Sequence, residues 1–173
     1  MNFDMINEEV LYTTDEITKI NAKDINMLKS KASNNPRKRM RLCAHNNTED
    51  TLHEMLILLA RGAYFRPHKH INKSESFHII EGNLSVVIFG ESGDVQEVIK
   101  MGSFSSGDMF YYRISESYFH TVIPESDLVV FHETTNGPFQ RDDTSYAVWA
   151  PVEEDSEGQK RFLEDLNKRL NRV

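Results

Sequence analysis

Residues 62–82 read GAYFRPHKHINKSESFHIIEG and contain two histidines, His68 and His70, two positions apart. Alternate side chains of a β-strand point to the same side, so both imidazoles can face one cavity. The following INKS segment has a composition typical of a turn. A strand that begins at Glu75, directly after this turn, can return its carboxylate to the same cavity. The stretch therefore predicts two antiparallel strands around a polar site.

Short apolar runs separated by Gly, Pro, Asn and Ser extend from this stretch in both directions. Between residues 40 and 150 there are at least eight such runs at nearly regular spacing, which is typical of a sandwich or a barrel. In LSVVIF (84–89), both alternating faces are largely apolar, as in a strand covered on both sides. The pattern predicts an all-β fold, an antiparallel β-barrel or jelly roll, with Gly62, Gly82 and Gly107 at turns.

The two ends of the chain have a different texture. Residues 22–33 and 156–171 read as short N-terminal and C-terminal helices, and Asn21 is placed to cap the first one. Residues 1–18 show no clean period and are interpreted as a loose arm or an edge strand. With 173 residues, the chain fits one domain over 1–173.

The composition excludes several classes of partner. The chain has 39% hydrophobic residues and a formal charge of -7, which predicts a folded globule without general affinity for nucleic acid or for anionic membrane surfaces. No apolar run approaches membrane-spanning length, and residues 1–10 do not read as a secretory signal. The single cysteine, Cys43, suits a reducing compartment. We therefore expect a cytoplasmic location.

A fourth polar residue, His120, lies far along the chain in the segment FHTV. Three imidazoles and one carboxylate suit a divalent first-row ion such as Fe, Mn, Co, Ni or Zn, and the Irving–Williams order does not choose among them. The competing interpretation is structural, because two strand histidines can also be surface residues or hydrogen-bonded core groups. The sequence favours a metal site formed by His68, His70, Glu75 and His120.

The spacing of the first motif carries a family resemblance. It runs glycine, five residues, histidine, one residue, histidine, four residues, glutamate, six residues, glycine, at positions Gly62, His68, His70, Glu75 and Gly82. This pattern resembles the first motif of the cupin superfamily at every fixed position and spacing. The resemblance implies a cupin-type antiparallel β-barrel that holds a metal ion.

The second cupin motif is matched in part. Gly107 and His120 are present, two residues farther apart than in the family pattern. Ser115, Ser117 and Pro124 stand where that pattern has Pro, Gly and Asn. The family match therefore supports the fourth ligand less than the other three.

Residues 15–170 as a whole resemble one cupin branch, the WbuC family of cupin-fold metalloproteins. The likeness includes PRKRMRLCAH (36–45), NGPF (136–139) and WAPVEED (149–155). It implies a role in bacterial O-antigen or related surface-polysaccharide (lipopolysaccharide) biosynthesis. Two functions follow as hypotheses: a metal-dependent enzyme acting on a sugar or sugar nucleotide, such as an isomerase, epimerase or oxygenase, and a non-catalytic metal-dependent sugar-binding or regulatory module.

Five further residues are candidates for ligand contact or chemistry. Arg66 has the strand parity of the motif histidines and suits an anionic ligand, and Lys73 lies in the turn. Tyr118 has the parity of the fourth metal ligand, and His45 matches a position where the WbuC relatives also carry histidine. Glu133 is the candidate acid or base. We expect an anionic sugar derivative as the ligand, and a homodimer, because barrel edges and terminal helices are common docking surfaces.

Overall fold

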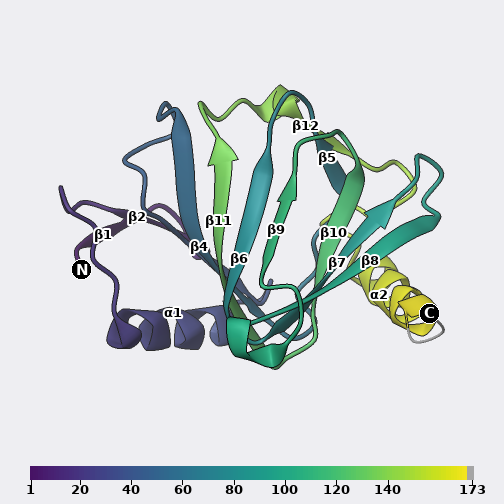
Figure 1. Ribbon diagram of the computed structural model, residues 1–173, viewed down its shortest axis with the longest axis horizontal. Coiled ribbons are helices and arrows are strands. Elements are labelled where there is room, and N and C mark those ends of the chain that lie inside the picture. Colours follow the sequence, from purple (N-terminus) through teal and green to yellow (C-terminus); the bar gives the residue numbers. More distant parts are fainter. Residues whose placement is uncertain (171–173) are drawn as a thin grey trace.

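Two β-sheets face one another in the computed structural model, which describes residues 1–170 (Figure 1). The larger sheet has seven strands in the order β1-β2-β3-β4-β11-β6-β9. Its strands, in that order, are Phe3–Met5, Val10–Thr13, Arg39–Cys43, Leu52–Ala60, Leu128–Asn136, Glu75–Glu81 and Tyr111–Ile114.

The smaller sheet has five strands in the order β12-β5-β10-β7-β8. These strands are Thr144–Tyr146, His68–His70, Phe119–Pro124, Asn83–Phe89 and Val95–Gly102. Two short 3-10 turns, Phe104–Ser106 and Arg141–Asp143, and two helices, α1 (Ala22–Asn34) and α2 (Ser156–Leu170), complete the described elements. The predicted all-β fold, a barrel of two facing sheets with two short terminal helices, is confirmed. Position 171 of the predicted second helix lies outside the described residues.

Side chains from both sheets form the central core. The alternation within β7 shows why: Leu84, Val86 and Ile88 join the core between the sheets, whereas Val87 and Phe89 join a separate cluster under α2. The facing sheet covers one apolar face of β7, and α2 covers the other. The prediction from LSVVIF that this strand is covered on both sides therefore holds.

The two helices cover opposite outer faces of the barrel (Figure 1). Leu28 and Ala32 of α1 are fully buried against the seven-stranded sheet. Leu166 of α2 is buried against the five-stranded sheet, beside Trp149. Asn21 caps α1 through a reciprocal capping box with Asp24, as its sequence predicts. None of the helices in residues 1–170 is both long and apolar enough to cross a membrane.

The N-terminal residues differ from the simplest expectation. Residues 1–18 contain β1 at the sheet edge and β2 inside it, so the edge-strand interpretation holds for β1. β2 and β3 run parallel, whereas the sequence predicts an antiparallel barrel throughout. The reason is that α1 connects these strands, and a crossover helix brings the chain back in the same direction. The other strand pairs are antiparallel.

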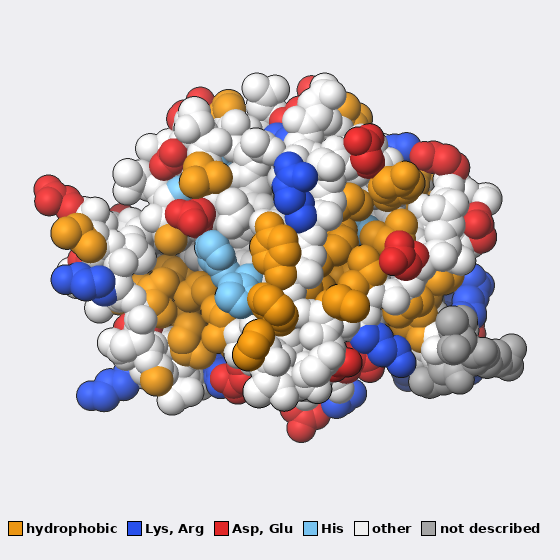
Figure 2. Space-filling model, in the orientation of Figure 1, with side chains coloured by type: hydrophobic (Ala, Val, Ile, Leu, Met, Phe, Trp, Pro, Cys, Tyr) orange, Lys and Arg blue, Asp and Glu red, His pale blue; other side chains and the backbone are white. Residues whose placement is uncertain are grey.

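An apolar surface patch surrounds β9, the edge strand of the seven-stranded sheet at the end opposite β1. Figure 2 shows orange hydrophobic side chains running through the middle of this face. The exposed apolar residues here are Phe104, Met109, Phe110 and Tyr111. Such a patch beside an unpaired strand edge is typical of a contact surface, and the homodimer remains a prediction.

Candidate metal centre

The four residues of the predicted metal site lie together. One ligand atom from each of His68, His70, Glu75 and His120 lies within 4.8 Å of the others. His68 and His70 belong to β5, and His120 belongs to β10 in the same sheet, directly opposite His68. This is a group that could hold a divalent ion.

The carboxylate comes from the other sheet. The turn at residues 71–74 leads, as predicted, to a strand that begins at Glu75 and returns its carboxylate to the same cavity, but β6 does not pair with β5. The turn instead crosses the barrel, and β6 pairs with β11 and β9 in the seven-stranded sheet. Glu75 therefore faces the histidines across the cavity rather than beside them. Parity within one sheet could not reveal this, because it does not say which sheet a strand joins.

Each histidine ring is held in one orientation by its Nδ1 atom. Nδ1 of His68 donates to the carbonyl oxygen of Arg66 at 3.0 Å, and Nδ1 of His120 donates to that of Tyr118 at 3.0 Å. Nδ1 of His70 contacts the hydroxyl of Thr144 at 3.3 Å. A carbonyl oxygen only accepts hydrogen bonds, so the Nε2 atoms of His68 and His120 keep their lone pairs for an ion. This is the outer-shell arrangement that orients histidine ligands in metal sites.

Two atoms of the cluster are buried without a hydrogen-bond partner within residues 1–170. They are Oε1 of Glu75 and Nε2 of His120, which lie 3.3 Å apart. A buried polar atom without a partner is costly, and both atoms point at the same small volume. The donor set, the ring orientations and these orphaned atoms all fit a divalent cation.

The pKa shifts within the cluster show which charges its environment favours. Burial and the charge of His120 lower the pKa of His68 to about 3, so its imidazole is neutral. Burial alone would raise the pKa of the Glu75 carboxyl, but contacts with His120 and His70 bring it well below its usual range. Burial alone would lower the pKa of His120, but the Glu75 carboxylate raises it. The site thus stabilises one positive charge beside Glu75, which a proton or a metal ion can supply.

The cluster lies on the wall of a cavity of about 370 Å³ between the sheets. Glu133 of β11 lines the same cavity, and it is in register with Phe77 of β6. Burial, reinforced by the negative charge of Glu75, raises the pKa of Glu133 to about 8, while Arg41 and His120 oppose the shift. Glu133 is therefore a second carboxyl group that faces the same space and holds its proton near neutral pH.

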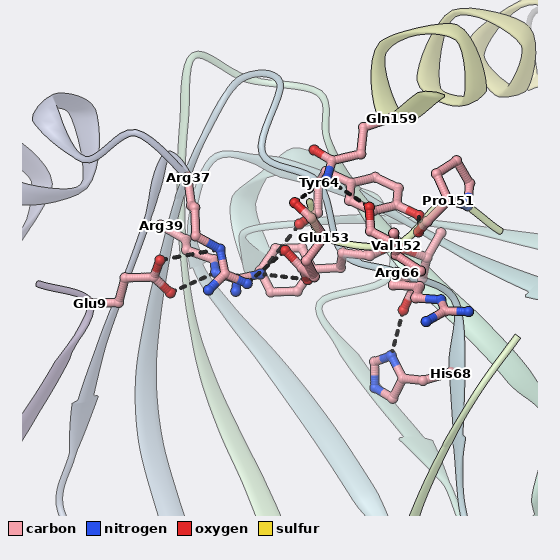
Figure 3. Close-up of polar contacts among 12 residues, drawn as sticks. Glu9, Arg37, Arg39, Tyr64, Arg66, His68, Pro151, Val152, Glu153 and Gln159 are labelled. Carbon is pink, nitrogen blue, oxygen red and sulfur yellow. Dashed lines mark hydrogen bonds and ion pairs between the residues drawn. The ribbon is translucent and has the colours of Figure 1, made fainter. Parts of the chain in front are cut away.

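Arg66 lines the cavity, as its parity predicts. Its Nε and Nη2 atoms both donate to the carbonyl oxygen of Ala147, at 3.2 and 2.8 Å. Its guanidinium also lies 5.5 Å from the centre of the Tyr146 ring. Figure 3 shows the backbone carbonyl of Arg66 meeting the ring of His68. Arg66 therefore contacts the metal cluster through its backbone and the segment after β12 through its side chain.

The remaining candidates lie away from the cavity. Lys73 pairs with Asp143 at 3.0 Å and donates to the carbonyl of Pro138. Tyr118 has a side chain that is 49% exposed, and it reaches the site only through its carbonyl oxygen. His45 is buried in a stack with His53, 4.1 Å between ring centres. None of these three side chains lines the cavity that the described residues form, so their assignment to ligand binding stays a prediction without a geometric basis.

An ionic network at the cavity is not predicted by the motifs. Arg37 and Arg39 each contact the carboxylates of both Glu9 and Glu153, at 2.6 to 3.5 Å (Figure 3). These residues come from three separate segments of the chain. The alternation within the basic run PRKRMR (36–41) places Arg37, Arg39 and Arg41 along the cavity. That period-two spacing was the available signal.

Comparisons with known proteins give a partial family match and general fold likenesses. Residues 20–101 match a family model described as a domain of unknown function (DUF6016). No protein in the curated set matches.

Three solved structures illustrate the likenesses. A Shewanella oneidensis protein shares 13% identity and a TM-score of 0.48, over 60% of this chain and 66% of that one. Oxalate decarboxylase from Bacillus subtilis has 21% sequence identity and a TM-score of 0.45, and the match covers 57% of this chain and 24% of that one. The Cnp3 cupin domain of Schizosaccharomyces pombe has 13% sequence identity and a TM-score of 0.45, and the match covers 57% of this chain and 64% of that one. The match thus spans less than two thirds of the length of each of these three proteins. The fold assignment rests on the strand order and register of the protein itself.

Proposed function

We propose that the protein is a metal-dependent cupin that binds one divalent first-row ion at His68, His70, Glu75 and His120 and acts on a small sugar derivative. The observation that carries this proposal is the orientation of the histidine rings. The Nδ1 atoms of His68 and His120 are engaged by backbone carbonyls, which leaves their Nε2 atoms free to bind the ion beside Glu75.

The chemistry that this arrangement supports is proton transfer next to a polarised oxygen. A bound divalent ion supplies a Lewis acid for a carbonyl or hydroxyl oxygen of the ligand. Glu133 lines the same cavity and can exchange a proton with a carbon beside that oxygen. Isomerisation or epimerisation needs these two elements. Oxygenase chemistry is the alternative if the ion is iron.

The substrate class rests on the WbuC resemblance. That likeness supports a place in bacterial surface-polysaccharide (O-antigen) biosynthesis, and hence a sugar or sugar-nucleotide ligand. The volume of the cavity, about 370 Å³, lies within the range of small-molecule sites. The non-catalytic sugar-binding module is the competing function, and turnover separates the two.

The test is solvent-isotope exchange into bound ligands. Metal-loaded protein is incubated in D₂O with a panel of nucleotide sugars and sugar acids, and mass spectrometry follows deuterium uptake and product formation. We expect metal-dependent uptake by at least one ligand, and its loss in Glu133→Gln with binding retained. Binding without uptake or turnover across the panel would support the module. Binding that is unaffected by metal removal would contradict both.

A further inference from the structure

Four arginines line the cavity, and they fall into two groups by their partners. Arg37 and Arg39 are each paired with Glu9 and Glu153. Two positive charges therefore meet two negative charges, and this network is neutral in itself. Its role is to tie the segments before β2, around β3 and before α2 together at the cavity.

Arg41 and Arg66 have no carboxylate within ion-pair distance in the described part of the chain. The donors of Arg66 are directed at the Ala147 carbonyl and its face lies over Tyr146. The Arg41 guanidinium, by contrast, makes no side-chain hydrogen bond or ion pair to any residue in 1–170, and Arg41 is exposed. Among the cavity arginines, Arg41 is the one whose full fork of donors is available to a ligand.

The position of Arg41 on β3 is fixed by its neighbours. Its backbone is in register with Val10 of β2 and Ile57 of β4, and its backbone N–H donates to the carbonyl of Glu9 at 2.7 Å. Met40 and Leu42, on the opposite face of β3, are buried under α1. Strand alternation therefore keeps the side chain of Arg41 on the cavity side.

We propose that Arg41 forms an anion subsite that binds a phosphate or carboxylate group of the ligand whose other end reaches the metal centre. This proposal rests on the proposed function and assigns the charge-recognition role to Arg41 instead of Arg66. A guanidinium presents a planar fork that matches both kinds of oxyanion. A cavity that holds a divalent ion and two cations without carboxylate partners favours a negatively charged occupant.

The strand order of the seven-stranded sheet also indicates the length of that ligand. β3 and β6 are separated by β4 and β11, which is three strand spacings or roughly 14 Å between backbones. Glu133, on β11, lies between them and lines the same cavity. The order along the cavity is metal ligands, Glu133, Arg41. A ligand that engages both ends is thus an extended molecule, such as a sugar phosphate or a sugar acid, that passes over Glu133.

The test compares Arg41→Gln with Arg161→Gln, which removes the same charge from an exposed position of α2. Mn²⁺ binding is measured by electron paramagnetic resonance, and calorimetry then measures binding of glucose 1-phosphate, glucuronate and neutral glucose. We expect wild type and both variants to bind Mn²⁺ equally. Arg41→Gln should weaken binding of one or both anionic probes at least tenfold, and Arg161→Gln should leave it unchanged. A comparison of glucose 1-phosphate with glucuronate shows whether the subsite binds a phosphate or a carboxylate.

Each failure has its own signature. A wild-type protein that binds none of Mn²⁺, Fe²⁺, Co²⁺, Ni²⁺ and Zn²⁺ would contradict the proposed function. Normal Mn²⁺ binding together with wild-type anion affinity in Arg41→Gln would overturn the anion subsite alone. Loss of Mn²⁺ from Arg41→Gln would also overturn it, because Arg41 would then act on the metal ligands.

Discussion

His120 of β10 lies directly opposite His68 of β5 in the antiparallel register, and its Nε2 atom is 3.3 Å from Oε1 of Glu75 on the facing sheet. Two histidines are thus joined by the ladder of one sheet, and the carboxylate reaches them from the other. An ion bound here would link the two halves of the barrel. Metal binding is therefore expected to be coupled to stability.

The first prediction concerns this coupling. Adding Mn²⁺ at about one hundred times its dissociation constant should raise the free energy of unfolding by about 2.7 kcal/mol, because the folded state binds the ion and the unfolded state does not. Urea denaturation with Mn²⁺ and with EDTA measures the difference. His120→Ala should show little response to the ion. An equal response in wild type and His120→Ala would place the stabilising ion elsewhere.

The second prediction concerns the pH dependence of stability in the metal-free protein. The pKa of Glu133 is raised from 4.5 to about 8, so the folded state retains a proton that the unfolded state releases. Glu133 therefore does not lower the free energy of unfolding below about pH 4.5. It lowers it increasingly as the pH rises from about 4.5 to about 8, and by a constant amount above that.

Glu133→Gln removes this cost. In EDTA, the free energy of unfolding of the variant should rise relative to wild type between pH 5 and 8, by roughly 3 kcal/mol. One pKa unit is worth about 1.4 kcal/mol, and solvent screening of this partly exposed carboxyl reduces the full effect. Denaturation curves across this range measure the gain. Glu164→Gln, an exposed change on α2, is the control. A gain that does not vary with pH would contradict the burial of Glu133 as a charge-sensitive group.

Sequence patterns predicted the fold because it depends on local signals. The apolar alternation of β7 indicated a strand covered on both faces, and Asn21 indicated the start of α1, as the structure has them. The parallel pairing of β2 with β3 was missed, because a short arm carries no signal for the strand that it joins. Strand pairing is decided by contacts distant in the sequence.

The candidate site, like the fold, was predicted only in part. The spacing of His68, His70 and Glu75 indicated the cluster, although the crossing of the turn between sheets did not follow from it. Parity could not decide where Glu133 points, because β11 and β10 belong to different sheets. The partners of Lys73 and His45, Asp143 and His53, could not be predicted either, because Lys73 and His45 lie in loops.

The third prediction concerns the turn between β6 and β7. Gly82 has a φ of 82°, and an added Cβ would meet the backbone carbonyl oxygen of Leu128. Gly82→Ala combines a left-handed conformation with this collision and should destabilise the protein by roughly 3 kcal/mol or more. Gly107 has a φ of 86° with open space around it, so Gly107→Ala should cost roughly 1–2 kcal/mol. Equal costs in urea denaturation would contradict the close approach at Gly82.

The fourth prediction concerns Arg66. Its two hydrogen bonds to the Ala147 carbonyl need a fork of donors, which lysine lacks. Arg66→Lys should therefore cost about 1 kcal/mol of stability, near the net value of a protein hydrogen bond. Metal content should stay unchanged, because the contact between Arg66 and His68 runs through the backbone. Loss of metal from Arg66→Lys would show that the side chain positions the metal ligand.

The most direct test of the account is the metal content of purified, untagged protein and four variants. Elemental analysis measures it after equilibration with Mn²⁺, Fe²⁺, Co²⁺, Ni²⁺ or Zn²⁺ in turn. His68→Ala and His70→Ala each remove one of the four ligands, whereas His78→Ala removes an exposed histidine on β6 and serves as the matched control. We predict one equivalent of a divalent ion in wild type and in His78→Ala, and little or none in His68→Ala or His70→Ala. Full occupancy in a His68→Ala, His70→Ala double variant that remains folded would contradict the metal centre.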